Sequence, residues 1–225
     1  MSRAELIRRY VFFLVGLYVN SLGIALITRA NLGTSPISST PYVLSLWNPA
    51  LSLGMFTLFF SLFLIALQLI VLGKRFPKHF WLQIPVSFLL SAFIDLSMAL
   101  LFFVDPHFYP LQILSLLVGC VVLGFGVFME VAANVVMLPG ECTVKSITMR
   151  WHTDFGKTKI AVDVTMVVVA AVLGFILCGK LTGIREGSVI SALLVGFIAR
   201  SVGKMIGEPI QRLLRDKTPA DVCAE

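Results

Sequence analysis

The sequence predicts an all-α membrane protein whose six transmembrane helices form two inverted three-helix repeats, each with a possible re-entrant half-helix after its first helix. Three observations predict this fold. The 225 residues are 58% hydrophobic and only 13% charged, whereas soluble proteins carry about 25% charged residues. The apolar residues gather in long runs separated by basic segments. The order of polar and glycine-rich segments in the first half also returns in the second.

Each of six apolar runs is long enough to cross a bilayer, since about 20 helical residues span roughly 30 Å of hydrocarbon. The expected spans are residues 10–29, 51–73, 82–104, 111–137, 158–178 and 188–207. The fourth run is long enough to tilt or break. The whole chain is expected to form one transmembrane domain, made of repeat 1 at about 10–104, repeat 2 at about 111–207 and a cytoplasmic basic tail at 208–225.

Basic residues set the expected orientation. They cluster before the first span, between the second and third spans, between the fourth and fifth spans, and in the tail, whereas the connection 30–50 has none. Cytoplasmic loops of membrane proteins carry an excess of lysine and arginine. We therefore expect a bacterial inner-membrane protein with both termini in the cytoplasm. The net charge of +6 is assigned to contact with membrane lipid headgroups, and no nucleic-acid partner is expected.

An internal repeat is indicated by two alignments. A shift of 107 residues places Gly33–Ser39 over Gly140–Ser146, and each segment follows an apolar span. In the third helix of each half, small or polar residues recur every four positions, over 87–99 and again over 188–196. Because each half has an odd number of spans, the second copy enters the membrane from the opposite side. Secondary transporters use such inverted repeats and bind solute near the midplane between them.

The connection after the first span predicts a half-helix at residues 36–47. Pro36 suits the first turn of a helix, where its missing N–H costs nothing, and Ser35 or Thr34 is a candidate cap. The second half has a comparable connection at 138–157, which is long for a link between neighbouring membrane helices.

In the second connection, Cys142 or Thr143 takes the place of Pro36, which predicts a half-helix at 143–152. Two half-helices entering from opposite faces point their positive ends toward one centre, which favours an anion or the carboxylate of a zwitterion. The alternative is that both helices lie flat on the membrane surface.

Ionisable residues inside spans are functional candidates because their desolvation must be compensated. Asp95 and Glu130 are the strongest candidates for handling substrate or protons. Asn20 lies at the centre of the first span. Asp163 is closer to an interface, and Arg200 is an alternative, structural counter-ion for Asp95 or Asp163.

The expected substrate-binding residues come from the two connections and from polar positions within the spans. They are Asn20, Gly33, Thr34, Ser35, Ser38, Asp95, Glu130, Asn134, Gly140, Glu141, Cys142 and Thr143. No metal-ligand spacing, phosphate-binding loop or hydrolase motif is present, so we expect no catalytic residue, metal or cofactor and no enzyme activity. Gly203 and Gly207 permit close helix packing, either internally or in a homodimer.

The segment Ala30–Pro36, ANLGTSP, follows the first span and gives this chain a further resemblance. With the small-residue third helix in each half, it resembles the YczE/YyaS/YitT-like bacterial membrane proteins over about residues 10–207. The resemblance implies topology and inner-membrane location, and it supplies no catalytic residues.

Together, these features predict a small secondary transporter, or a transport-like binder, of a small polar solute that is anionic or zwitterionic. Three alternatives remain open from the sequence: a substrate-binding subunit of a larger transport complex, a small ion channel, and a membrane scaffold without a solute. The sequence does not identify the solute, the coupling ion or the direction of transport.

Overall fold

The computed structural model describes residues 3–104, 106, 108–179, 183 and 185–214, and the secondary structure in these residues is entirely helical. The helices are α1 (Arg3–Arg29), α2 (Pro36–Trp47), α3 (Leu53–Leu72), α4 (Gln83–Leu100), α5 (Tyr109–Ala133), α6 (Pro139–Trp151), α7 (Phe155–Cys178) and α8 (Glu186–Leu214), with short 3-10 helices η1 (Gly73–Arg75) and η2 (Lys78–Leu82) between α3 and α4.

Six helical segments in the described ranges are long and apolar enough to cross a membrane, which confirms the predicted all-α membrane fold with six spans. They correspond to the six predicted spans, and the protein is a multi-pass membrane protein. The fourth span ends at Ala133 rather than at residue 137 because Asn134 adopts left-handed backbone dihedrals and caps α5. The last helix continues to Leu214, well into the predicted tail, and residues 215–225 lie outside the described part.

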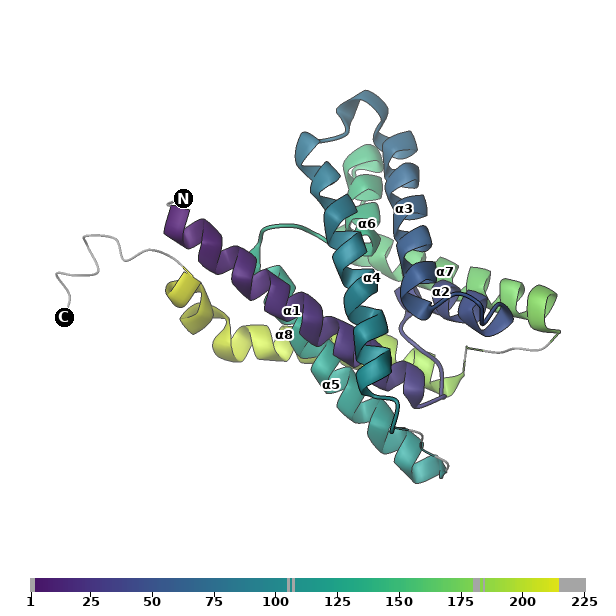
Figure 1. The fold of residues 1–225 in the computed structure, drawn as a ribbon. Helices are drawn as coiled ribbons and strands as arrows, with labels where there is room; N and C mark the ends of the chain where they lie inside the picture. The colour runs from purple at the N-terminus through teal and green to yellow at the C-terminus, as the bar shows by residue number, and fades with distance from the viewer. Residues whose placement is uncertain (1–2, 105, 107, 180–182, 184, 215–225) are drawn as a thin grey trace.

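The centre of the molecule is the crossing of α1 and α5 (Figure 1). Glycines allow the two backbones to approach closely. A Cβ atom on Gly23 would lie 2.6 Å from the Cα of Leu123, and one on Gly126 would lie 2.7 Å from the Cα of Asn20. In lipid, such small residues let helices gain packing contacts that larger side chains prevent.

A second glycine pair at the same crossing has the same reciprocal relation. A Cβ on Gly16 would meet the Met129 side chain at 2.8 Å, and one on Gly119 would meet the Ile27 side chain at 2.7 Å. Each helix thus contributes two glycines to the crossing, and each glycine lies against the partner helix.

The two short helices pack on helices from the other half of the chain. Helix α2 packs against α7, and α6 packs against α3. Helix α4 lies on α1 and α3, and α8 lies along α5, as Figure 1 shows. The consequence is that the beginning of each short helix reaches the interior of the molecule.

Helix α2 begins at Pro36 as predicted, but α6 begins at Pro139, four residues before the predicted start at 143. Both prolines occupy the first turn. The residues before them, Ser35 and Leu138, have the same extended dihedrals, φ −64° and ψ 153°. Pro139, rather than Cys142 or Thr143, therefore takes the place of Pro36, because proline at the first helical position is already fixed near helical φ.

Candidate solute-binding cavity

A cavity of about 200 Å³ lies where the beginnings of α2 and α6 meet the long helices. Its lining includes Ser35, which is the N-cap residue of α2, and Ile37 of α2. Pro139 and Gly140 of α6 also line it. The two short helices touch here, since a Cβ on Gly140 would lie 2.8 Å from Cδ1 of Ile37. Segments 33–39 and 140–146 therefore approach each other, as we expected from the sequence.

One side of this cavity carries a buried amide–acid pair from the central helix crossing. Asn20 of α1 and Glu130 of α5 both line the cavity. The Nδ2 group of Asn20 donates a hydrogen bond of 2.7 Å to Oε1 of Glu130. Glu130 is only 7% exposed, and among the described residues only Asn20 donates a hydrogen bond to it. The carboxylate consequently retains accepting capacity beside the cavity.

A second acid, Glu141, enters the cavity from the first turn of α6. No residue in the described ranges donates a hydrogen bond to its side chain. Burial raises the pKa of Glu141, the nearby Lys159 lowers this pKa, and Asp163 raises it further. Its position at the helix N-terminus is the one that favours a negative charge.

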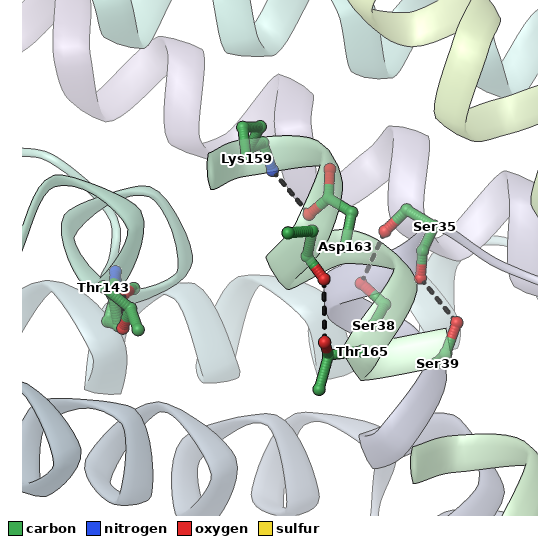
Figure 2. Close-up of polar contacts among 9 residues, drawn as sticks. Ser35, Ser38, Ser39, Thr143, Lys159, Asp163 and Thr165 are labelled. Carbon is green, nitrogen blue, oxygen red and sulfur yellow. Dashed lines mark hydrogen bonds and ion pairs between the residues drawn. The ribbon is translucent and has the colours of Figure 1, made fainter. Parts of the chain in front are cut away.

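Helix α7 adds an ion pair to the cavity lining. The Lys159 Nζ atom lies 2.8 Å from Oδ1 of Asp163, one helical turn further on (Figure 2). The side chains are 29% and 24% exposed, so both remain partly accessible. Asp163 therefore pairs with Lys159 rather than with Arg200, which is exposed on α8.

Hydroxyl groups line the part of the cavity at the beginning of α2. The Ser35 Oγ donates to Ser38 Oγ at 3.1 Å, and Ser39 Oγ donates to the Ser35 carbonyl at 2.9 Å (Figure 2). Ser35 occupies the N-cap position as predicted, but its side chain makes no capping hydrogen bond. The expected capping hydrogen bond from the Ser35 side chain is therefore not formed, because the Ser35 hydroxyl donates to Ser38 instead.

Gly33 and Thr34, also expected in the site, are not among the residues that line the cavity. They attach the connection after α1 to the beginning of α8. The Thr34 N–H donates to Ser188 Oγ at 3.1 Å, and Ser191 Oγ donates to the Thr34 carbonyl at 3.4 Å. Gly33 has φ 111°, and a Cβ there would lie 2.3 Å from the Ser188 hydroxyl oxygen, so only glycine fits without rearrangement.

Asp95, also expected in the site, is not among the residues that line either of these cavities. Its Oδ2 accepts a 2.6 Å hydrogen bond from the Ser52 hydroxyl, and its Oδ1 accepts a 2.8 Å bond from the Gly54 N–H. These donors lie at the beginning of α3, whose first N–H groups have no partner within the helix. Within the described residues no ion pair joins Asp95 to Arg200. The carboxylate instead fixes the N-terminus of α3 to α4.

Two of the remaining expected residues, Asn134 and Cys142, lie at a second cavity of about 360 Å³. Asn134, Cys142 and Lys145 line it, and burial raises the pKa of Cys142 to about 12. Three residues line both cavities, namely Glu130, Leu138 and Glu141. The two spaces therefore adjoin at the two acids. Thr143 lies in neither lining.

This arrangement of short helices, acids and cavities can be set beside known families. Residues 7–204 match the model of a family described as a family of unknown function, DUF6198. The chain belongs to the DUF6198 family. No curated protein and no solved structure matched it. The match gives no specific support to the resemblance to YczE/YyaS/YitT-like proteins.

In this DUF6198 member, an important polar contact was missed from the sequence. Gln68 of α3 and Gln83 of α4 are fully buried and exchange two hydrogen bonds, of 3.2 and 3.0 Å. The Gln68 amide also donates to the Pro139 carbonyl at 3.0 Å and to Thr143 Oγ1 at 3.1 Å. The pair therefore holds the beginning of α6 in place.

Lys159 is the other residue that sequence analysis missed. The sequence does indicate this contact, since a lysine and an aspartate four residues apart on one helix commonly form an intrahelical ion pair. From the sequence we considered Arg200, and not Lys159, as the counter-ion of Asp163. Gln68 also had a signal, because an amide within an apolar span needs a hydrogen-bonding partner.

Proposed function

We propose that this protein is a small secondary transporter, or a transport-like binder, of a small polar solute. The observation that carries the proposal is the cavity at which α2 and α6 meet beside Asn20, Glu130 and Glu141. A binding site in a membrane protein typically lies where irregular or broken helices meet at a polar interior space. A volume of about 200 Å³ is below the roughly 300–1,000 Å³ of typical drug-sized sites, so it fits a small solute.

We also propose that the two halves are inverted repeats. The reciprocal glycine contacts between α1 and α5 support this idea. So does the exchange of short helices, with α2 on α7 and α6 on α3. The corresponding positions are Pro36 and Pro139, which are 103 residues apart, rather than pairs separated by 107. An inverted repeat would allow the cavity to open alternately to each side of the membrane.

The proposed location is the bacterial inner membrane, with both termini in the cytoplasm. Its support is the basic character of alternate connections, which marks the cytoplasmic side. Membrane lipid then contacts the apolar faces of α7 and α8, where Phe175, Ile176, Leu193 and Phe197 are exposed. A homodimer across one of these faces is compatible with the same exposure.

Cysteine accessibility tests whether the cavity is reached by water. In a chain whose four native cysteines are replaced by alanine, Ser38→Cys should react with a membrane-impermeant thiol reagent. Ser97→Cys is the matched negative control, since Ser97 is fully buried and lines neither cavity. Ala50→Cys is the exposed positive control. If Ser38→Cys is as inert as Ser97→Cys, the cavity is closed to solute and the proposal fails.

Reconstituted vesicles distinguish a carrier from its rivals. A carrier should exchange labelled solute across the membrane without unitary currents, whereas a channel should give currents in a planar bilayer. A binding subunit should copurify with an ATPase. A scaffold should show Ser38→Cys labelling that no solute reduces.

A further inference from the structure

The cavity has an unequal charge balance. Glu130, Glu141 and Asp163 contribute three carboxylates to its lining, whereas Lys159 is the one basic side chain there among the described residues. Lys159 is already paired with Asp163 at 2.8 Å. The remaining two acids form no salt bridge within the described part of the chain, although Lys159 is near enough to lower the pKa of Glu141. Like-charged neighbours disfavour joint ionisation unless a further cation lies between or beside them.

The two acids also have unused hydrogen-bonding capacity. A carboxylate has about four acceptor positions. Glu130 receives one hydrogen bond, from Asn20, and Glu141 receives none from any residue that the structure describes. Glu130 is only 7% exposed, so bulk water has little access to the unused acceptor positions of its side chain. Buried acceptors of this kind are costly unless a donor reaches them.

Several other residues of the same cavity lining are apolar and favour contact with a carbon chain rather than with a metal ion. They include Leu64, Leu90, Leu123 and Val127. A bare metal ion would need oxygen ligands on several sides, whereas an alkyl chain gains free energy from contact with an apolar wall. An ammonium group supplies three donors in one compact cation.

We propose that the solute carries a protonated amine, which Glu130 and Glu141 bind together while its carbon skeleton lies against the apolar wall. This inference rests on the proposed function and specifies the small polar solute as a small amine or an amine-bearing zwitterion, in place of the anion that the sequence also allowed. In a zwitterion, the Ser35 and Ser38 hydroxyls at the beginning of α2 are placed to receive the acidic end.

Thermal unfolding of the purified protein with a matched solute series tests this inference. The series consists of straight-chain amines, ω-amino acids and carboxylic acids of two, four and six carbons, at equal ionic strength. Amines or ω-amino acids should raise Tm by roughly 5 °C at saturation, while the acids leave Tm unchanged. The same amines should slow the labelling of Ser38→Cys.

The variants Glu130→Gln and Glu141→Gln should each lose the amine-dependent rise in Tm. Glutamine at position 130 still accepts from Asn20, so the fold-stabilising contact remains. Glu186→Gln is the matched control, because its carboxylate is 47% exposed and lies outside the cavity. If one variant fails to fold, the other variant and the solute series on the parent chain still test whether the cavity binds an amine.

Four results would overturn the inference: a larger shift with the acids than with the amines, no shift with any amine, the same shift with sodium chloride alone, and an equal loss in Glu186→Gln. In each case, if Ser38→Cys is still labelled, the cavity is accessible to water and the proposed function is retained although the amine inference fails. Absence of that labelling removes the proposed function as well.

Discussion

The Asn20 amide on α1 donates a 2.7 Å hydrogen bond to the Glu130 carboxylate on α5, which joins the central helix crossing to the cavity. Asn20→Leu should therefore destabilise the protein by about 1–3 kcal/mol, because a buried carboxylate loses its donor. The measurement is Tm in detergent. Asn20→Leu combined with Glu130→Leu should recover part of the loss, since neither polar group is then left unpaired. Parent-like stability in the single variant would contradict the assigned contact.

Asp95→Ala should lower the free energy of unfolding by about 0.5–2 kcal/mol, the usual range for loss of a helix N-terminal cap. The reason is that Asp95 accepts from Ser52 and Gly54 at the beginning of α3. Solute binding should remain intact, because Asp95 lines neither cavity. Adding Arg200→Gln should not restore stability. Restoration would show that the two residues interact.

Gly23→Ala should destabilise the protein by about 1–3 kcal/mol, the typical cost of overpacking a close contact. The added methyl would lie 2.5 Å from the Leu123 backbone nitrogen, which cannot move without displacing α5. Gly207→Ala is the matched control, since a Cβ there meets nothing within 4 Å. Chemical denaturation or Tm should separate the two variants, and equal effects would count against the glycine crossing.

The stability of the protein should decrease as the pH rises above the ordinary pKa of Glu141, 4.5, because burial raises this pKa in the folded state. The folded protein then holds a proton that the unfolded chain releases, so the contribution is present at low pH and is lost as the pH rises through the folded value. Glu130, Lys159 and Asp163 face the same cavity as Glu141.

Glu141→Gln removes this titration and should give a shallower decline of Tm as the pH rises above 4.5. The comparison is between the parent chain and the variant in the same buffers. A decline of the same slope in both would assign the pH dependence to other groups.

The spans were predictable because hydrocarbon requires every backbone polar group to be bonded within a helix, which forces long apolar runs. Helix α2 was predictable from Pro36. Helix α6 was placed four residues too late because the alignment matched Gly33 with Gly140. In the structure, Gly33 is a left-handed loop residue, whereas Gly140 lies inside a helix, so the two glycines have unrelated roles.

The cavity was only partly predictable. Asn20, Ser35, Ser38, Glu130 and Glu141 were selected as polar residues in or beside apolar spans, and all five line the cavity. Depth within a span does not reveal which side of a helix meets a neighbour, so the contacts of Asp95 could not be predicted from its position in the sequence. Its side chain found donors on α3 instead of the interior space.

The packing of α2 on α7 has a consequence for how the chain is made. A ribosome completes α2 long before α7, so during synthesis α2 can contact the adjacent α3 but not yet the surface of α7 that will cover it. The hydroxyl-rich beginning of α2 must therefore remain in contact with water or the insertion machinery until the second half has entered the bilayer. Helix α6 faces no such delay, because α3 is already in place when α6 emerges. Final docking of α2 is consequently a late event of biogenesis, and truncation after α4 leaves α2 without its contacts to α7.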